Sequence, residues 1–220
     1  MSQRRAAAFL FLIALPLPHQ AQNPPNFLLI AEEQLRPNTE ARYSRIESRT
    51  ARMCSELKCP NPYLALVSDK KPIKILWLNE LNSAADSQRV AAAYASNKTL
   101  TATLNKQVAR KKPLVLPLIV HWARYRSDLS QHCSWNVGIA RYYVVQSARE
   151  KAAFEGCVFE STDGWRFAIV QRRTRADAQR LQATAGTGAA VFTPRPSWSY
   201  PADAWISAAP EFWRIRTRIK

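Results

Sequence analysis

Residues 114–133 read LVLPLIVHWARYRSDLSQHC, a central and strongly apolar stretch that carries two of the three histidines of the chain. Pro117 suits the first position of a helix. Four apolar residues then recur at spacings of four, three and four, as on one face of a helix: Leu118, Trp122, Tyr125 and Leu129. This pattern predicts a buried amphipathic helix.

The two histidines of this stretch, His121 and His132, are the candidate catalytic residues. On one unbroken helix they would stand roughly 16 Å apart, so we predict neither a metal site nor a cofactor. One interpretation is that both are structural histidines. The alternative is a metal-independent hydrolase of a phosphate or glycan backbone centred on His121, in which Arg124 stabilises the developing negative charge.

Residues 1–22 have the pattern of a signal peptide, because Arg4 and Arg5 precede an apolar run over residues 6–17. The run is too short to span a bilayer, so we expect no transmembrane helix in the mature chain. The expected location is extracytoplasmic, either periplasmic or secreted. Residues 23–37 begin with the sequence NPPN and lack a clear period, which predicts a linker; the short FLLIA run over residues 27–31 could instead be an edge strand or the tail of a processed segment.

Four cysteines follow the leader, and an even number in an exported chain indicates two disulfides. Three connectivities are possible, and local pairing favours Cys54 with Cys59 and Cys133 with Cys157. The first pair requires the helix that carries Cys54 to end before Cys59, because five positions along a helix are too distant to bridge. Neither pair has the ligand spacing of a structural zinc site.

The remaining patterns predict one α+β domain over residues 38–220, with antiparallel sheet elements and several helices. Helices are expected over 38–57, 83–97 and 175–185, each with a capping residue at its start: Asn38, Ser83 and Thr174. Two hairpins are expected, over 63–78 and 157–171, and the alternation in 98–104 predicts a further strand. A Pro- and aromatic-rich loop is expected over 193–211, in which Trp198, Tyr200 and Trp205 either stack on sugars or bases or pack as core.

The chain has a formal net charge of +16. Cleavage after the leader would leave about +14, which favours an anionic polymer as partner: an envelope glycan, a nucleic acid or an acidic protein. Two arginine-rich faces are candidate anion-binding sites. The helix over 38–57 carries Arg42, Arg45, Arg49 and Arg52, partly offset by Glu40, Glu47 and Glu56, and a strand over 213–220 carries Arg214, Arg216, Arg218 and Lys220. A merely solvated surface is the alternative for both faces.

No HExxH, GxSxG, Walker, GxGxxG or EF-hand motif occurs, which argues against the enzyme and nucleotide-binding classes that those motifs define. The order of a helix, CPNPYLALVSD, an AYAS segment and an apolar stretch with a histidine resembles secreted gluzincin-type zinc peptidases. Where that family has HExxH, this chain has His121-Trp122-Ala123-Arg124-Tyr125, without the glutamate and the second ligand. The resemblance therefore implies an inactive relative of those peptidases.

The function that the sequence favours is a binding or interaction module for an anionic envelope or extracellular polymer. Whether the protein is also an enzyme depends on whether His121 opens into a cleft with arginine or carboxylate neighbours.

Overall fold

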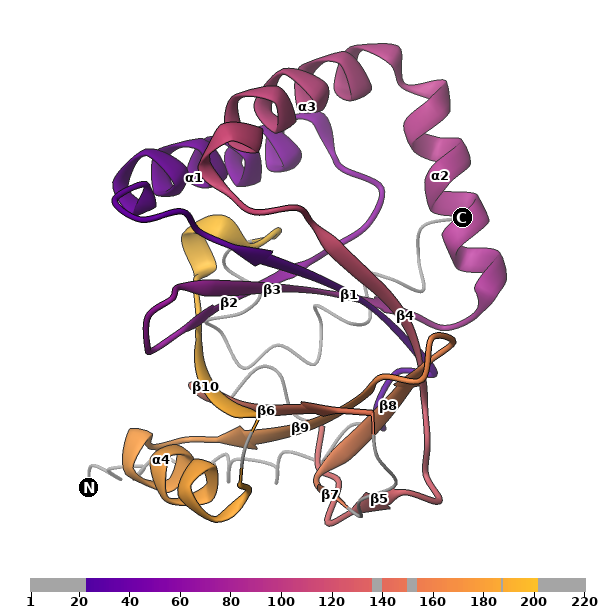
Figure 1. Ribbon diagram of the computed structural model, residues 1–220. Helices are drawn as coiled ribbons and strands as arrows, with labels where there is room; N and C mark the ends of the chain where they lie inside the picture. The colour runs from indigo at the N-terminus through magenta and orange to yellow at the C-terminus, as the bar shows by residue number, and fades with distance from the viewer. Residues whose placement is uncertain (1–22, 136–139, 150–153, 187, 202–220) are drawn as a thin grey trace, which may run out of the picture.

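The computed structural model describes residues 23–135, 140–149, 154–186 and 188–201. Its central feature is a closed eight-stranded antiparallel barrel with the strand order β1-β3-β2-β10-β6-β9-β8-β4 (Figure 1). The prediction of a plain α+β domain with separate sheet elements was therefore wrong. The sheet closes on itself because two four-stranded halves are joined through β2–β10 and β4–β8 pairing, and local patterns in the sequence do not encode such long-range pairs.

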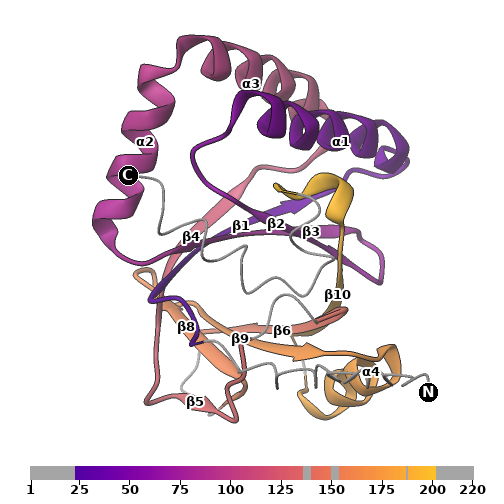
Figure 2. The same cartoon turned by 180° about the vertical axis from the view of Figure 1, so that it is seen from behind.

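The first half of the barrel has the order β4-β1-β3-β2, built from β1 (Phe27–Gln34), β2 (Leu64–Ser68), β3 (Lys74–Leu81) and β4 (Ile119–Tyr125). Helix α1 (Glu40–Leu57) links β1 to β2. Helices α2 (Ala84–Ser96) and α3 (Lys98–Lys111), followed by the short η1 (Lys112–Leu114), link β3 to β4. Helices α1 and α3 lie side by side over the outer face of this half (Figures 1 and 2).

The second half repeats this strand order as β10-β6-β9-β8, with β6 (Tyr142–Ala148), β8 (Cys157–Ser161), β9 (Arg166–Arg172) and β10 (Ala189–Pro194). Helix α4 (Arg175–Thr184) links β9 to β10 and covers the outer face. Strands β5 (Ser130–Gln131) and β7 (Phe154–Glu155) form a small parallel pair beside β8. After β10, the short η2 (Pro196–Trp198) packs against α1 in the first half.

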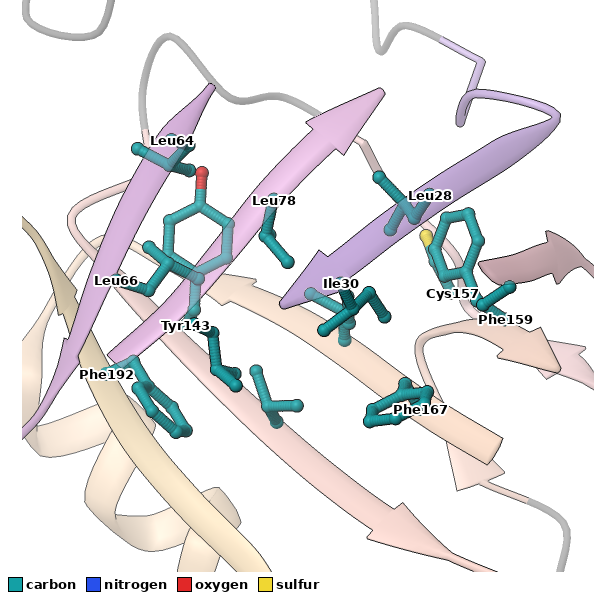
Figure 3. Packing of buried hydrophobic residues seen from close by; sticks show 14 of the residues in the cluster. Leu28, Ile30, Leu64, Leu66, Leu78, Tyr143, Cys157, Phe159, Phe167 and Phe192 are labelled. Atoms are coloured by element: carbon teal, nitrogen blue, oxygen red, sulfur yellow. The ribbon is translucent and has the colours of Figure 1, made fainter. Parts of the chain in front are cut away.

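The barrel interior is filled by side chains from all eight strands, so it is a packed core and not a channel (Figure 3). Leu28 and Ile30 from β1 face Phe167 and Ile169 from β9, and all four side chains are buried. Period-two alternation sends the other side chains of these strands outward, towards α1 and α3 on one half and α4 on the other. The protein therefore has a central core and two outer apolar layers.

The stretch at 114–133 forms a strand where the sequence predicted a helix. Strand β4 places His121, Ala123 and Tyr125 inward, and Val120 and Trp122 outward. Both faces are apolar, so the period-two signal of a half-buried strand is weak and the chance helical spacing dominates. The zinc-peptidase resemblance loses its structural basis here, because His121 lies on a strand.

Two further local predictions differ from the structure. Phe27–Gln34, within the expected linker, forms β1, which pairs along its length with β3 and β4. Residues 98–104, expected as a strand, begin α3, because the Asn97 side chain accepts the backbone N–H of Leu100 and starts a helix.

Other predicted elements are confirmed. Both hairpins form, as β2–β3 and β8–β9. Helix α1 ends before Cys59, and the structure has the disulfides Cys54–Cys59 and Cys133–Cys157. Over the described ranges, no helix is long and apolar enough to cross a membrane.

Candidate anion-binding site

Helix α1 has one face in the core and the opposite face in solvent. Four of its five buried residues recur at spacings of four, four and three, namely Tyr43, Glu47, Ala51 and Cys54; the fifth is Met53. The opposite face carries four exposed arginines, which we call the basic row: Arg42, Arg45, Arg49 and Arg52. Since the row spans ten residues of helix, it is about 15 Å long.

Glu47 points into the core from the buried face and belongs to an ionic cluster. The ammonium group of Lys111, at the end of α3, lies 3.0 Å from the Glu47 carboxylate and 2.9 Å from that of Glu33 on β1. Glu33 also accepts a hydrogen bond from the Tyr43 hydroxyl and one of 3.3 Å from the Trp77 indole N–H. One lysine therefore serves two buried carboxylates.

Burial raises the pKa of Glu47 above its ordinary value, and the nearby Lys111 only partly offsets this effect. Burial would lower the pKa of Lys111, but the attraction of Glu47 and Glu33 outweighs it and raises that pKa. Burial, reinforced by Glu47 and Glu33, also raises the pKa of Tyr43. The cluster thus keeps its lysine charged and makes Glu47 harder to ionise than an exposed glutamate.

The position of Glu47 changes the charge balance of α1. From the sequence, this residue was expected to offset the basic row, but its carboxylate is buried and paired with Lys111. The exposed acids Glu40 and Glu56 lie at the two ends of the helix. In the described part of the chain, no ion pair involves an arginine of the basic row. The row is therefore a net cationic surface, with the exposed Glu56 one turn beyond Arg52.

An open pocket of about 930 Å³, which we call the α1 pocket, lies at the N-terminal end of this helix. Its walls come from the β1–α1 connection, the first turns of α1, the β2–β3 turn and the segment after β10. Leu35 and Trp198 are buried residues of its wall, and the Trp198 ring packs edge-on against Tyr43. Ala41 lines the pocket one turn before Arg45, so the basic row begins beside it.

Three exposed cations from three separate segments lie around the α1 pocket: Arg36, Lys71 and Arg195. Glu40 is the single acidic residue of its lining. The Arg36 Nε–H donates to the Val115 carbonyl at 3.2 Å, which holds this guanidinium beside the pocket. Guanidinium and ammonium groups bind phosphate and carboxylate groups, so the α1 pocket and the neighbouring basic row are candidate sites for anionic groups.

The candidate catalytic residues of the sequence lie apart. His121 is buried at one end of the barrel, where its ring contacts Phe167 and its Nδ1 lies 3.3 Å from Asp163. His132 is exposed at the opposite end of β8, beside the Cys133–Cys157 disulfide. Arg124 points out of the barrel on the opposite face of β4 from His121. The structure therefore brings His121 together with a carboxylate but not with His132 or Arg124.

The second predicted anion-binding face, with Arg214, Arg216, Arg218 and Lys220, lies outside the described residues, as do the predicted signal peptide and Trp205. In the aromatic loop, Trp198 is core and Tyr200 is half-buried. No three His, Cys, Asp or Glu side chains gather as a metal site in the ranges that the structure covers.

Sequence reasoning missed the three cations of the α1 pocket, because they come from distant segments. It also missed Lys111 and Glu33 as partners of Glu47. One signal was available for Glu47: it stands four residues from both Tyr43 and Ala51, on the apolar face of the predicted helix.

No known family profile matches the chain, and no curated protein matches it in sequence. Solved structures with a similar backbone include a candidate monooxygenase from Fusobacterium nucleatum, with 7% identity, a TM-score of 0.47, and coverage of 79% of this chain and 93% of that one. A candidate chlorite dismutase has 11% identity, a TM-score of 0.45 and coverage of 82% and 99%. A candidate monooxygenase from Lactobacillus acidophilus has 9% identity, a TM-score of 0.43 and coverage of 77% and 93%.

Proposed function

We propose that this protein binds an anionic polymer along the basic row of α1, with one anionic group of that polymer seated in the α1 pocket. The observation that carries the proposal is the burial of Glu47 against Lys111, which leaves the four exposed arginines of the row with the exposed acids of α1 at the two ends of the helix, at Glu40 and Glu56. Each arginine that contacts a phosphate, sulfate or carboxylate releases a counterion, so binding is strong at low salt and weakens as salt rises.

The polymer is extracytoplasmic if the first 22 residues act as a signal peptide. The two disulfides are compatible with that location. An envelope glycan with phosphate or uronate groups fits the geometry, because a row of about 15 Å presents successive guanidinium groups to successive anionic units. Nucleic acid and acidic protein carry the same kind of charge and are tested beside it.

The test compares two triple variants of equal charge change. The first, R42Q/R45Q/R49Q, removes most of the basic row. The control, R141Q/R173Q/R180Q, removes three exposed arginines from the second half of the barrel. Binding to labelled heparin, single-stranded DNA and polyglutamate is measured by fluorescence anisotropy from low to high salt. Both variants are expected to unfold within about 1 kcal/mol of the parent, since the changes are exposed.

For the first variant, we expect weaker binding at low salt. The slope of the logarithm of the binding constant against the logarithm of the salt concentration should become shallower by about 2, because three contacts with anionic groups are lost. The control is expected to keep most of the salt slope. Equal losses in the two variants would mean that only net charge matters, and the site would then be abandoned. A third variant, R214Q/R216Q/R218Q, measures the contribution of the predicted carboxy-terminal face.

The α1 pocket is tested by R36Q/R195Q. We expect this change to weaken binding of short anionic fragments more, in fold terms, than binding of the long polymer. The physical reason is that a short fragment depends on the pocket, whereas a long chain keeps its contacts with the basic row. If R36Q/R195Q weakened the binding of short fragments and of the long polymer by the same factor, the α1 pocket would not be part of the polymer-binding site.

A further inference from the structure

Strands β4 and β8, which close the barrel, pair over only part of the length of β4. Strand β4 pairs with β1 from Ile119 to Arg124, but it pairs with β8 only from Ala123 to Tyr125. Strand β8 ends at Ser161, and its hairpin turn follows there. Among the residues that the structure describes, the first four of β4 therefore have a strand on one side only, at the place where β4 runs beyond β8 in Figure 1.

The backbone of this segment has hydrogen-bonding groups directed to the open side. The N–H of Tyr125 donates to Asn26, on the β1 side, and that of Arg126 donates to Val158, on the β8 side. Because successive residues of a strand alternate, Trp122 and Val120 direct their N–H and C=O groups to the β8 side, where the neighbouring strand has ended. The edge therefore offers a ladder that can pair with another extended chain.

Exposed apolar side chains concentrate on the same segment. Within the described residues, five of the six large exposed hydrophobic side chains lie between residues 116 and 122: Leu116, Leu118, Ile119, Val120 and Trp122. On the neighbouring β1, Leu29 pairs with Trp122 and Ala31 with Val120, so the outward surface continues as an apolar patch. Proteins usually protect an exposed sheet edge with charges, and residues 114–123 contain no Lys, Arg, Asp or Glu.

We propose that β4 pairs with β4 of a second copy of this chain, antiparallel and centred on Val120, to form a two-fold symmetric dimer. The edge is self-complementary in this register. Val120 exchanges its backbone hydrogen bonds with Val120 of the partner subunit, and Leu118 lies opposite Trp122 of the partner subunit.

Charge favours a second copy at this edge over other surfaces of the protein. Two molecules that each carry a formal charge of +16 repel, and this uncharged segment is a place where they can approach closely. The two copies of Arg124 would lie roughly 27 Å apart in the register centred on Val120, well beyond the Debye length at physiological salt. Because the paired edge is a short strand segment, we expect a reversible dimer with a dissociation constant in roughly the micromolar range.

Sedimentation velocity of the full, disulfide-intact chain over a concentration series tests the proposal. We expect V120K, at a side chain 44% exposed, to weaken dimerisation at least tenfold without lowering the melting temperature. The matched control is V108K, which places the same charge at an exposed valine of α3, 56% exposed. Added salt is expected to strengthen the dimer by screening the like charges, in contrast to its effect on polymer binding.

Hydrogen exchange of the backbone amides tests the dimer in the protein without any substitution. Protection of the Val120 and Trp122 amides is expected to rise with protein concentration. A monomer at all concentrations, a dimer unaffected by V120K, or equal losses from V120K and V108K would each overturn the proposal. Val120 protection that does not change with concentration would also overturn it, because another segment would then cover the edge.

Discussion

The two halves of the barrel share one strand order and differ in what covers them. In the first half, α1 and α3 lie on the sheet and enclose the ionic cluster of Glu33, Glu47 and Lys111. In the second half, α4 packs on the apolar layer of Val144, Val170 and Val191. We therefore assign the proposed function to the first half, where Glu47 is buried against Lys111 and the arginines of α1 are exposed on the opposite face.

The largest effect is expected from breaking the ionic cluster of the first half. K111M leaves two buried carboxylates without their cation and should lower the free energy of unfolding by about 4 kcal/mol. The matched control is K106M, an exposed lysine on the same helix, for which we expect less than about 0.5 kcal/mol. Urea denaturation at neutral pH measures both. A loss below about 1 kcal/mol in K111M would show that the cluster is not needed for this half to fold.

The disulfides sharpen the comparison between the halves. Cys133 and Cys157 are 24 residues apart, and Cys54 and Cys59 only 5. Loop-closure entropy then predicts losses of about 3 kcal/mol for C133S/C157S and about 2 kcal/mol for C54S/C59S. Chemical denaturation of the two double variants gives the order. If C54S/C59S lowered the free energy of unfolding more than C133S/C157S, the Cys54–Cys59 disulfide would stabilise the protein through contacts in the folded state and not through loop closure.

The sequence predicts local elements well and the closure of the barrel poorly. The N-terminal caps of α2 and α4 could be predicted from the sequence. The side chain of Ser83 accepts the backbone N–H of Asp86, and that of Thr174 accepts the backbone N–H of Asp177, each three residues later. Strand β4 could not be predicted from the sequence, because its outward residues Val120 and Trp122 are as apolar as its inward residues. The barrel depends on pairs such as Phe192 with Ser68, more than 100 positions apart, which no local period reports.

The site could be predicted in part. The arginines of α1 share one face by spacing alone, so the basic row was visible in the sequence. The role of Glu47 could not be predicted from the sequence, because an acidic residue among arginines on a helix usually indicates a solvent-exposed ion pair. Its burial depends on Lys111, 64 positions later, and only the packing of α1 against α3 brings the two together.

A smaller effect, with a defined pH dependence, is expected from E47Q. Burial raises the pKa of Glu47 in the folded state, so its contribution to stability is full below the unfolded carboxyl's pKa and is lost as pH rises through the folded-state value. The neutral amide removes this loss, so E47Q should gain of the order of 1 kcal/mol over the parent at neutral and alkaline pH. Urea midpoints from about pH 4 to pH 9 test it. E33Q is the contrast: it should destabilise, because Glu33 accepts hydrogen bonds from Tyr43 and Trp77 that an amide cannot fully replace.

The smallest effect is expected in the second half, with the opposite pH dependence. The hydroxyl of Ser161 donates to Asp163 and, together with the nearby His121, lowers the pKa of this exposed carboxyl. Its contribution is therefore present above the unfolded carboxyl's pKa and is lost as pH falls through the folded-state value. D163N should flatten the acid limb of the stability profile slightly and leave the alkaline limb unchanged, whereas E47Q changes the alkaline side. If D163N altered the alkaline limb, Asp163 would be coupled to a group other than Ser161 and His121.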